Sequence, residues 1–283
     1  MAKIVFGMDI ANLSAEKFDS DPLIVQRVTS AQRSALEKAD NELEEVKKKV
    51  QLPPIVILIG MAAAAGVPLC AKIIQGMLKR RTWEEFMAQT PWMFYIMIGC
   101  AAVVVLVILL AVIRSKTGMR RNDVRKAVAY IDKVHEDSRN MLGVPVNTEY
   151  TDILSCVYRM NNGQRVIVKN GEVAYINNKC CVFREDNALC IADTAMKLEI
   201  PLQSIKAIRK IDQRVTVSKW NKETAYNKGE YREYRIKMTK RDQPIFKYYY
   251  ALCFTHGSEE YELYFPPYEL PFIEQLTNVR APM

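Results

Sequence analysis

The sequence contains few of the side chains that most often carry out catalysis. Its 283 residues include only two histidines, His135 and His256. It has no G-x-x-x-x-G-K-[ST] phosphate loop, no G-x-G-x-x-G dinucleotide motif and no H-E-x-x-H zinc motif. The G-x-S-x-G elbow of many hydrolases is also absent. We therefore expect a non-enzymatic protein with no catalytic residue and no cofactor.

The seven cysteines indicate neither a disulfide framework nor a metal site. Cys70 and Cys100 lie in apolar runs, and the other five are Cys156, Cys180, Cys181, Cys190 and Cys253. An odd number that includes two adjacent cysteines is poorly suited to pairing. The paired C-x-x-C spacing of zinc ligands is missing. We expect no bound metal, and unpaired thiols favour a reducing compartment.

Charged side chains are missing from two long stretches. None occurs between Pro54 and Lys72 or between Pro91 and Arg114. A helix needs about 20 apolar residues to cross a bilayer, so we predict transmembrane helices at residues 54–78 and 91–113. Two buried core helices of a soluble protein are the alternative. Gly and Ala residues in both spans favour close packing of the two helices, and neither span has the acidic or histidine side chains of a transport pathway.

Lys and Arg residues predict the orientation of this hairpin. Nine of them flank the two spans, whereas three lie in the connecting segment 79–90. Positive charge is retained on the cytoplasmic side, so we expect a multi-pass protein of the cell membrane with both termini in the cytoplasm and residues 79–90 outside. Residues 1–22, a separate N-terminal segment, turn acidic and polar too early for a cleavable signal peptide.

Amphipathic segments adjoin both spans. Apolar residues repeat at heptad spacing in residues 23–52 and again in residues 114–142. They are Leu36, Ala39, Leu43, Val46, Val50, Val124, Ala127, Ile131 and Val134. We predict two cytoplasmic stalk helices that pair antiparallel as a coiled coil, with Ser138 interrupting the second series. Self-association of several chains is the alternative.

Short runs rich in Val, Ile, Tyr and Phe begin at about residue 150 and alternate with turn residues. They predict a mainly antiparallel β domain at residues 150–283. The strands expected include EVAYIN, RVTVSKW and EYREYRIKMT, and the final segment PPYELPFIEQLTNV is expected to form a helix.

Two segments of this domain resemble a known family. MKLEIPLQSIKAIRKI and EYELYFPPYELPFIEQL are similar to the central region and the last strand and helix of bacterial PH-like and GRAM-type domains. The resemblance implies a bent β-sandwich or partly open barrel plugged by a helix, with a role in binding membrane lipids or proteins. Extra length between Ile211 and Lys247 departs from the pattern, and we expect a long hairpin there.

Basic residues gather in and before this extra length. Residues 206–247 contain thirteen Lys or Arg against five Asp or Glu. Contact with anionic lipid or an acidic partner would suit such a patch, and its candidate residues are Lys206, Arg209, Lys210, Arg214, Lys219, Lys222, Arg232 and Arg235. Alternatively, these charges protect an exposed strand edge from aggregation. Interleaved aromatic residues would also suit single-stranded nucleic acid, but we do not expect that partner.

Together these patterns predict an α+β membrane protein, in which a transmembrane hairpin and coiled-coil stalk carry a PH-like domain capped by a C-terminal helix. We expect the domain to bind a protein or anionic lipid in a scaffolding or regulatory role. A subunit of a larger membrane complex that uses the stalk for partner contact is the rival. An enzyme acting on lipids would need a cluster of polar groups at the mouth of the domain.

Overall fold

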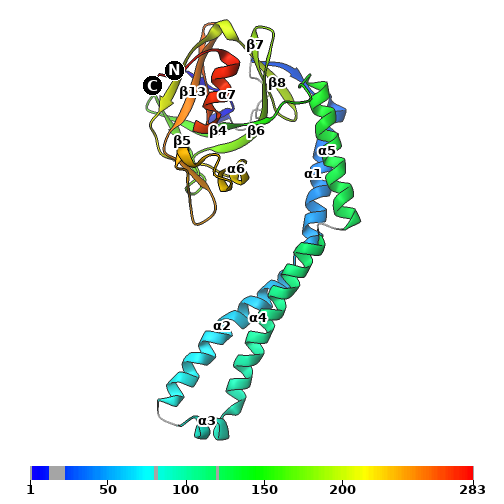
Figure 1. The fold of residues 1–283 in the computed structure, drawn as a ribbon, viewed down its shortest axis with the longest axis vertical. Coiled ribbons are helices and arrows are strands. Elements are labelled where there is room, and N and C mark those ends of the chain that lie inside the picture. Colours follow the sequence, from blue (N-terminus) through cyan, green and yellow to red (C-terminus); the bar gives the residue numbers. More distant parts are fainter. Residues whose placement is uncertain (1, 13–22, 80–81, 119–120, 283) are drawn as a thin grey trace. The chain divides into compact units, whose positions relative to one another are not determined.

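The computed structural model describes residues 2–12, 23–79, 82–118 and 121–282. The chain forms two compact units, each described by itself below (Figure 1). One unit, called the globular unit, joins residues 1–33 to residues 135–283, and the other, the helical unit, is residues 34–134. The helical unit is therefore an insertion between two parts of the chain that fold together.

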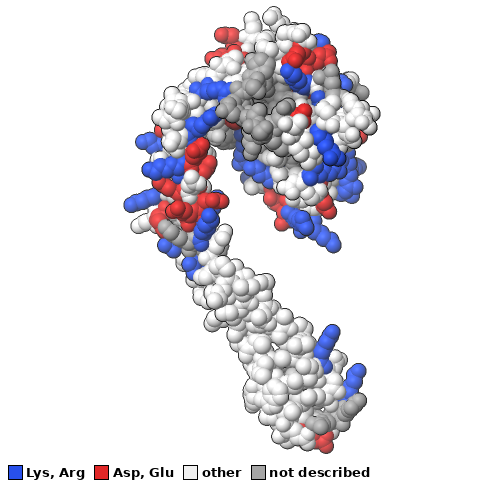
Figure 2. All heavy atoms as spheres, turned by 180° about the vertical axis from the view of Figure 1, so that it is seen from behind, with Lys and Arg blue, Asp and Glu red and all other residues white. Residues whose placement is uncertain are grey.

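Two long helices dominate the helical unit. Its elements are α1 (Ser30–Val50), α2 (Pro54–Leu78), α3 (Trp83–Gln89), α4 (Pro91–Gly118) and α5 (Asn122–Met141), of which α1 and α5 continue into the globular unit. Helices α2 and α4 are long and apolar enough to cross a membrane, and none of the most apolar stretch of either is buried. Buried core helices of a soluble protein would not show such exposure. In Figure 2 these helices form a nearly unbroken uncharged surface.

The expected close packing of α2 on α4 is confirmed at two glycines. A Cβ atom added to Gly60 would lie 3.0 Å from Val107, and one added to Gly66 would lie 3.1 Å from Cys100 Sγ. Helix α4 continues to Gly118 rather than ending at residue 113, because a helical backbone does not have to stop where the apolar run does. The segment 114–142 is consequently divided between α4 and α5.

The connecting segment contains a short capped helix, α3. Thr82 accepts a hydrogen bond from the Glu85 backbone amide, and Glu85 accepts one in return from the Thr82 amide, which makes a capping box. Phe86 is buried, and the Trp83 ring lies against both Phe86 and Phe94. Aromatic packing thus holds α3 against the start of α4.

Helices α1 and α5 lie side by side (Figure 1). A buried polar pair joins them. Gln32 Nε2 donates to Ser138 Oγ over 3.0 Å, and both side chains are buried. Ser138 therefore occupies a buried position of the α5 series as a polar residue, and its hydrogen-bond partner lies on α1. The heptad pattern alone did not predict this partner. Of the nine apolar positions predicted for the two helix faces, six are buried: Leu36, Ala39, Val124, Ala127, Ile131 and Val134. Leu43 and Val46 are only partly buried, and the Val50 side chain lies outside the described residues.

The globular unit is built on an eleven-stranded, mainly antiparallel sheet. Its central path runs β3-β8-β7-β6-β4-β14-β13-β9, and β1, β2 and β5 pair with members of this path. The strands are β1 (Lys3–Ile4), β2 (Gly7–Asp9), β3 (Ile24–Arg27), β4 (Tyr150–Asn161), β5 (Gln164–Ile167), β6 (Ile176–Glu185), β7 (Ala188–Ala192), β8 (Met196–Pro201), β9 (Ile205–Ile211), β13 (Tyr249–His256) and β14 (Glu259–Phe265). Helix α7 (Leu270–Thr277) follows β14 and packs through buried Ile273 into the larger core, as the final helix was expected to do.

The N-terminal residues belong to this sheet and are not a separate segment. Strands β1 and β2 pair in parallel with β14 and β4, and β3 pairs antiparallel with β8. Val5, Phe6 and Leu23 lie in the larger core. The first stalk helix consequently begins at Ser30, not at residue 23. These strands have two to four residues, too few to show a hydrophobic alternation.

The extra length after Ile211 folds as a small subdomain, so the expected long hairpin is wrong. It contains β10 (Val215–Thr216), α6 (Glu223–Asn227), β11 (Lys237–Met238) and β12 (Pro244–Phe246), with the strands in the order β10-β12-β11. Only two residues each of RVTVSKW and EYREYRIKMT are strand, and EVAYIN contributes only its last two. Trp220 and Tyr226 pack ring to ring here, so aromatic burial takes precedence over strand propensity.

Candidate functional site

Three of the candidate basic residues lie on β9, which is an edge strand of the main sheet. Lys206 pairs with Glu260 and Arg209 with Glu262, both on β14, while Lys210 pairs with Asp212. Charge along an edge strand discourages pairing with other chains. The arrangement favours the edge-protecting interpretation for this part of the basic stretch.

Lys222 has a different setting, because it reaches into a buried polar network. Its Nζ lies 2.8 Å from Glu269 Oε1, which also accepts the Asp152 backbone amide over 2.9 Å. The Asp152 carboxylate accepts from Tyr268 Oη and from Asn221 Nδ2, each over 2.7 Å. Burial disfavours the Lys222 ammonium, but the Glu269 carboxylate outweighs burial and holds the pKa of Lys222 above its ordinary value. This network joins the small subdomain to β4 and to the start of the C-terminal helix.

Replacing Lys222 by Met should therefore destabilise the protein far more than the same change at Lys206. The Lys222 and Glu269 side chains are 23% and 3% exposed, and loss of one partner leaves a buried charge, at a cost of about 3–5 kcal/mol. Lys206 and Glu260 are 54% and 64% exposed, and such surface pairs contribute about 1 kcal/mol or less. Thermal unfolding of the purified protein measures both.

A second change tests the cause of that effect. Adding Glu269→Gln to Lys222→Met removes the unpaired charge, so part of the lost stability should return. Equal midpoints for the Lys222 and Lys206 variants would contradict an energetic role for the buried pair.

The other candidate basic residues have different surroundings. Arg214, Lys219, Arg232 and Arg235 have no carboxylate partner among the described residues. Lys219 lines the cavity described below, whereas Arg232 and Arg235 lie beside Tyr231 and Tyr234, whose rings pack on Tyr268. Trp220 is buried against the same ring. These aromatic side chains are engaged internally, which does not favour base stacking.

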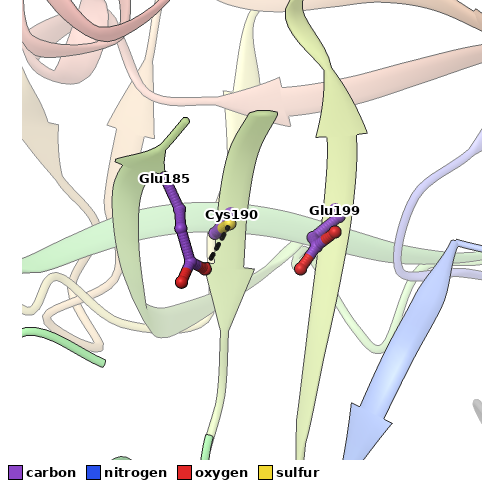
Figure 3. A group of neighbouring side chains, drawn as sticks. All are labelled: Glu185, Cys190 and Glu199. Carbon is purple, nitrogen blue, oxygen red and sulfur yellow. Dashed lines mark hydrogen bonds between the residues drawn. The ribbon is translucent and has the colours of Figure 1, made fainter. Parts of the chain in front are cut away.

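Glu185, Cys190 and Glu199 come together on β6, β7 and β8 (Figure 3). Their ligand atoms lie within 4.8 Å of one another, the spacing that a metal ion would need. However, the buried Lys197 ammonium contacts Glu185 and lies 3.3 Å from Glu199. Burial also raises the pKa of Cys190 to about 12, so its thiol stays protonated. A lysine cation already compensates these carboxylates, and the geometry does not favour a metal.

A cavity of about 460 Å³ opens where the main sheet divides. Strand β4 pairs with β6 through residues 150–155 and with β2 through residues 156–158. The last β4–β6 pair is Ser155 with Ile176, and the cavity lies at this divergence. Its lining residues are Phe6, Met8, Ser155, Cys156, Val157, Ile176, Asn178, Lys179, Cys180, Asp193, Thr194 and Lys219.

The cavity has an apolar interior and polar groups around it. Phe6, Cys156 and Cys180 are almost wholly buried. Asn178 Nδ2 donates to Ser155 Oγ over 2.8 Å, and the Asp193 carboxylate accepts the backbone amides of Ala195 and Met196. Its volume falls within the ~300–1,000 Å³ of most small-ligand sites. The cavity is therefore large enough for a small molecule.

Sequence reasoning identified only Lys219 among the residues of this cavity. Lys179 and the N-terminal Phe6 and Met8 were missed, because they come from elements more than 100 residues apart and no short motif joins them. Comparison of the chain with family models, with curated proteins and with solved structures finds no match. The candidate site is therefore argued from its geometry.

Proposed function

We propose that this chain is a membrane-anchored, non-enzymatic binding protein that presents a ligand-binding β domain on the cytoplasmic side. The insertion of an exposed apolar hairpin into a folded unit carries this proposal. Lipid would cover the apolar surface of α2 and α4, and the globular unit would supply the binding function through its cavity. PH-like domains have a helix that plugs a bent sheet. Helix α7, which packs on the core, would be the counterpart of that helix here.

The interrupted globular unit supports the hairpin topology. Strands β1 to β3 precede the apolar helices and β4 to β14 follow them, yet they share one sheet. Strands of one sheet must fold in one compartment, so the chain would cross the membrane twice rather than once. The Lys and Arg distribution and seven unpaired cysteines support the cytoplasm as that compartment.

The two charged helices would form a coiled-coil stalk between hairpin and domain. Residues of the predicted apolar series are buried on both helices, and the Gln32–Ser138 hydrogen bond joins them. If α1 and α5 of one chain pair through their apolar faces, those faces are not available for self-association of several chains. This favours partner binding at the domain over partner binding through the stalk.

Labelling of two introduced cysteines, one in each variant, with a membrane-impermeant maleimide tests the proposal. Ala88 in α3 and Ser258 in the β13–β14 turn are exposed, unlike Cys156, Cys180, Cys181 and Cys190, which are buried and poor reporters. With Cys253 replaced by Ser, Ala88→Cys should be labelled in intact cells and Ser258→Cys only after permeabilisation. The reverse pattern would overturn the orientation, and identical labelling of the two sites would overturn the two-span topology.

A further inference from the structure

We propose that the cavity between β2, β4 and β6 binds a single-chain anionic amphiphile, with its chain along Phe6, Met8 and Val157 and its anionic end at Lys179 and Lys219. The inference builds on the proposed binding role of the globular unit. It does not depend on membrane anchoring, because every residue involved lies within that unit.

The apolar part of the ligand follows from the interior of the cavity. Apolar side chains line part of it, among them Phe6, Met8 and Val157, and burial raises the pKa of Cys156 to about 12. Its thiol therefore stays neutral and acts as a small apolar group. A volume of about 460 Å³ holds roughly 15 groups of the size of a water, at ~30 Å³ each. One chain of about ten carbons with its head group fits a volume of this size.

The anionic end follows from the charges around the cavity. Lys179 and Lys219 are both exposed, and within the described residues neither ammonium forms an ion pair with a carboxylate. Asp193 is the acid that lines the cavity in the described part of the chain, and its Oδ1 atom accepts two backbone amides. Lys179 lies 5.9 Å from the Tyr150 ring, an aromatic contact that leaves its charge uncompensated. A carboxylate or phosphate would satisfy both lysines.

Photoaffinity labelling of the full chain in lipid nanodiscs tests this site. The probe is decanoic acid carrying a diazirine at its far end, and mass spectrometry locates the labelled peptides. We expect labelling at residues 2–9 or 150–161. Decanoate and decyl phosphate should compete at least tenfold better than decyltrimethylammonium, which has the same chain and opposite charge.

Two matched variants test the role of the lysines. Lys179→Gln with Lys219→Gln should lower labelling of the cavity at least tenfold. Lys237→Gln with Lys240→Gln, two exposed lysines outside the cavity, should leave it unchanged. Unchanged thermal midpoints would confirm that both variants are folded.

The outcomes also separate the two sources of the anion. Competition by decanoate alone would support a fatty acid, and equal competition by decyl phosphate would support any monoacyl anion. Labelling confined to residues 54–118 would overturn the proposal, because it would show that the probe only partitions into the lipid. Competition by inorganic phosphate as strong as that by decyl phosphate would overturn it as well. Failure of membrane anchoring would appear only in the cysteine labelling described above.

Discussion

Residues 135–283 expressed alone should not fold, whereas residues 1–33 joined to them by a short flexible linker should form a stable soluble protein. The N-terminal strands bring Val5, Phe6 and Leu23 into the larger core, where each is 6% exposed or less. Burying one such side chain contributes about 1.5–3 kcal/mol. Three of them supply roughly 5–9 kcal/mol, a large part of the ~5–15 kcal/mol that stabilises a typical domain.

The linker can be short because the two ends of the insertion meet. Gln32 Nε2 lies 3.0 Å from Ser138 Oγ, so residues 33 and 135 leave the globular unit near each other. About six Gly and Ser residues would span such a gap. Cooperative urea unfolding and dispersed amide resonances would identify the folded protein. A cooperative transition of the same midpoint in residues 135–283 alone would contradict a structural role for the N-terminal strands.

A pair of identical substitutions separates core burial from chain length. Val5→Thr places a hydroxyl in the core of the linked protein, at a cost of about 1–3 kcal/mol. Val25 lies in the same N-terminal region but is 53% exposed, so Val25→Thr should change stability by less than about 0.5 kcal/mol. Equal effects at the two positions would show that residues 1–33 contribute no specific packing.

The parts of the fold that could be predicted are those with a long local pattern. Uncharged runs between Pro54 and Lys72 and between Pro91 and Arg114 correspond to α2 and α4. Heptad spacing likewise corresponds to the buried faces of α1 and α5. Each pattern repeats over several helical turns, so neighbouring residues reinforce one another.

The parts that could not be predicted depend on distant partners. Lys3 and Ile4 pair with Tyr261 and Glu262, more than 250 residues away, and two residues contain no periodicity. Lys222 had the appearance of one more surface cation in a basic stretch. Only the fold brings Glu269 to it and makes it part of a buried network. The candidate cavity was missed for the same reason, since β2, β4 and β6 meet only in the sheet.

Replacing Gly66 by Cys should link α2 to α4 through a disulfide with native Cys100. The Cβ atom of residue 66 would lie 3.1 Å from Cys100 Sγ. In a disulfide, each Cβ lies about 3 Å from the sulfur of its partner, given an S–S bond of ~2.04 Å. The two residues are thus already placed for the bond, and mild oxidation in the membrane should convert most of the protein.

Gly76 provides the matched control. It lies on the same helix, but a Cβ atom added there meets nothing within 4 Å, so Gly76→Cys should stay reduced. Both variants are made with Cys70→Ser, which leaves Cys100 as the other cysteine of the two spans. The thiols are counted after denaturation with a maleimide–polyethylene glycol reagent. Two fewer reactive thiols in oxidised Gly66→Cys, with no change in Gly76→Cys, is the expected result.

The experiment decides whether small residues on α2 pack against α4 within one chain. Close approach of two helices in lipid needs Gly or Ala at the contact, and Gly60 and Gly66 both meet α4. A Gly66→Cys variant that forms linked dimers instead would show that these glycines face a second copy of the chain. The hairpin would then be an assembly surface, and the rival function as a subunit of a larger complex would gain its first support.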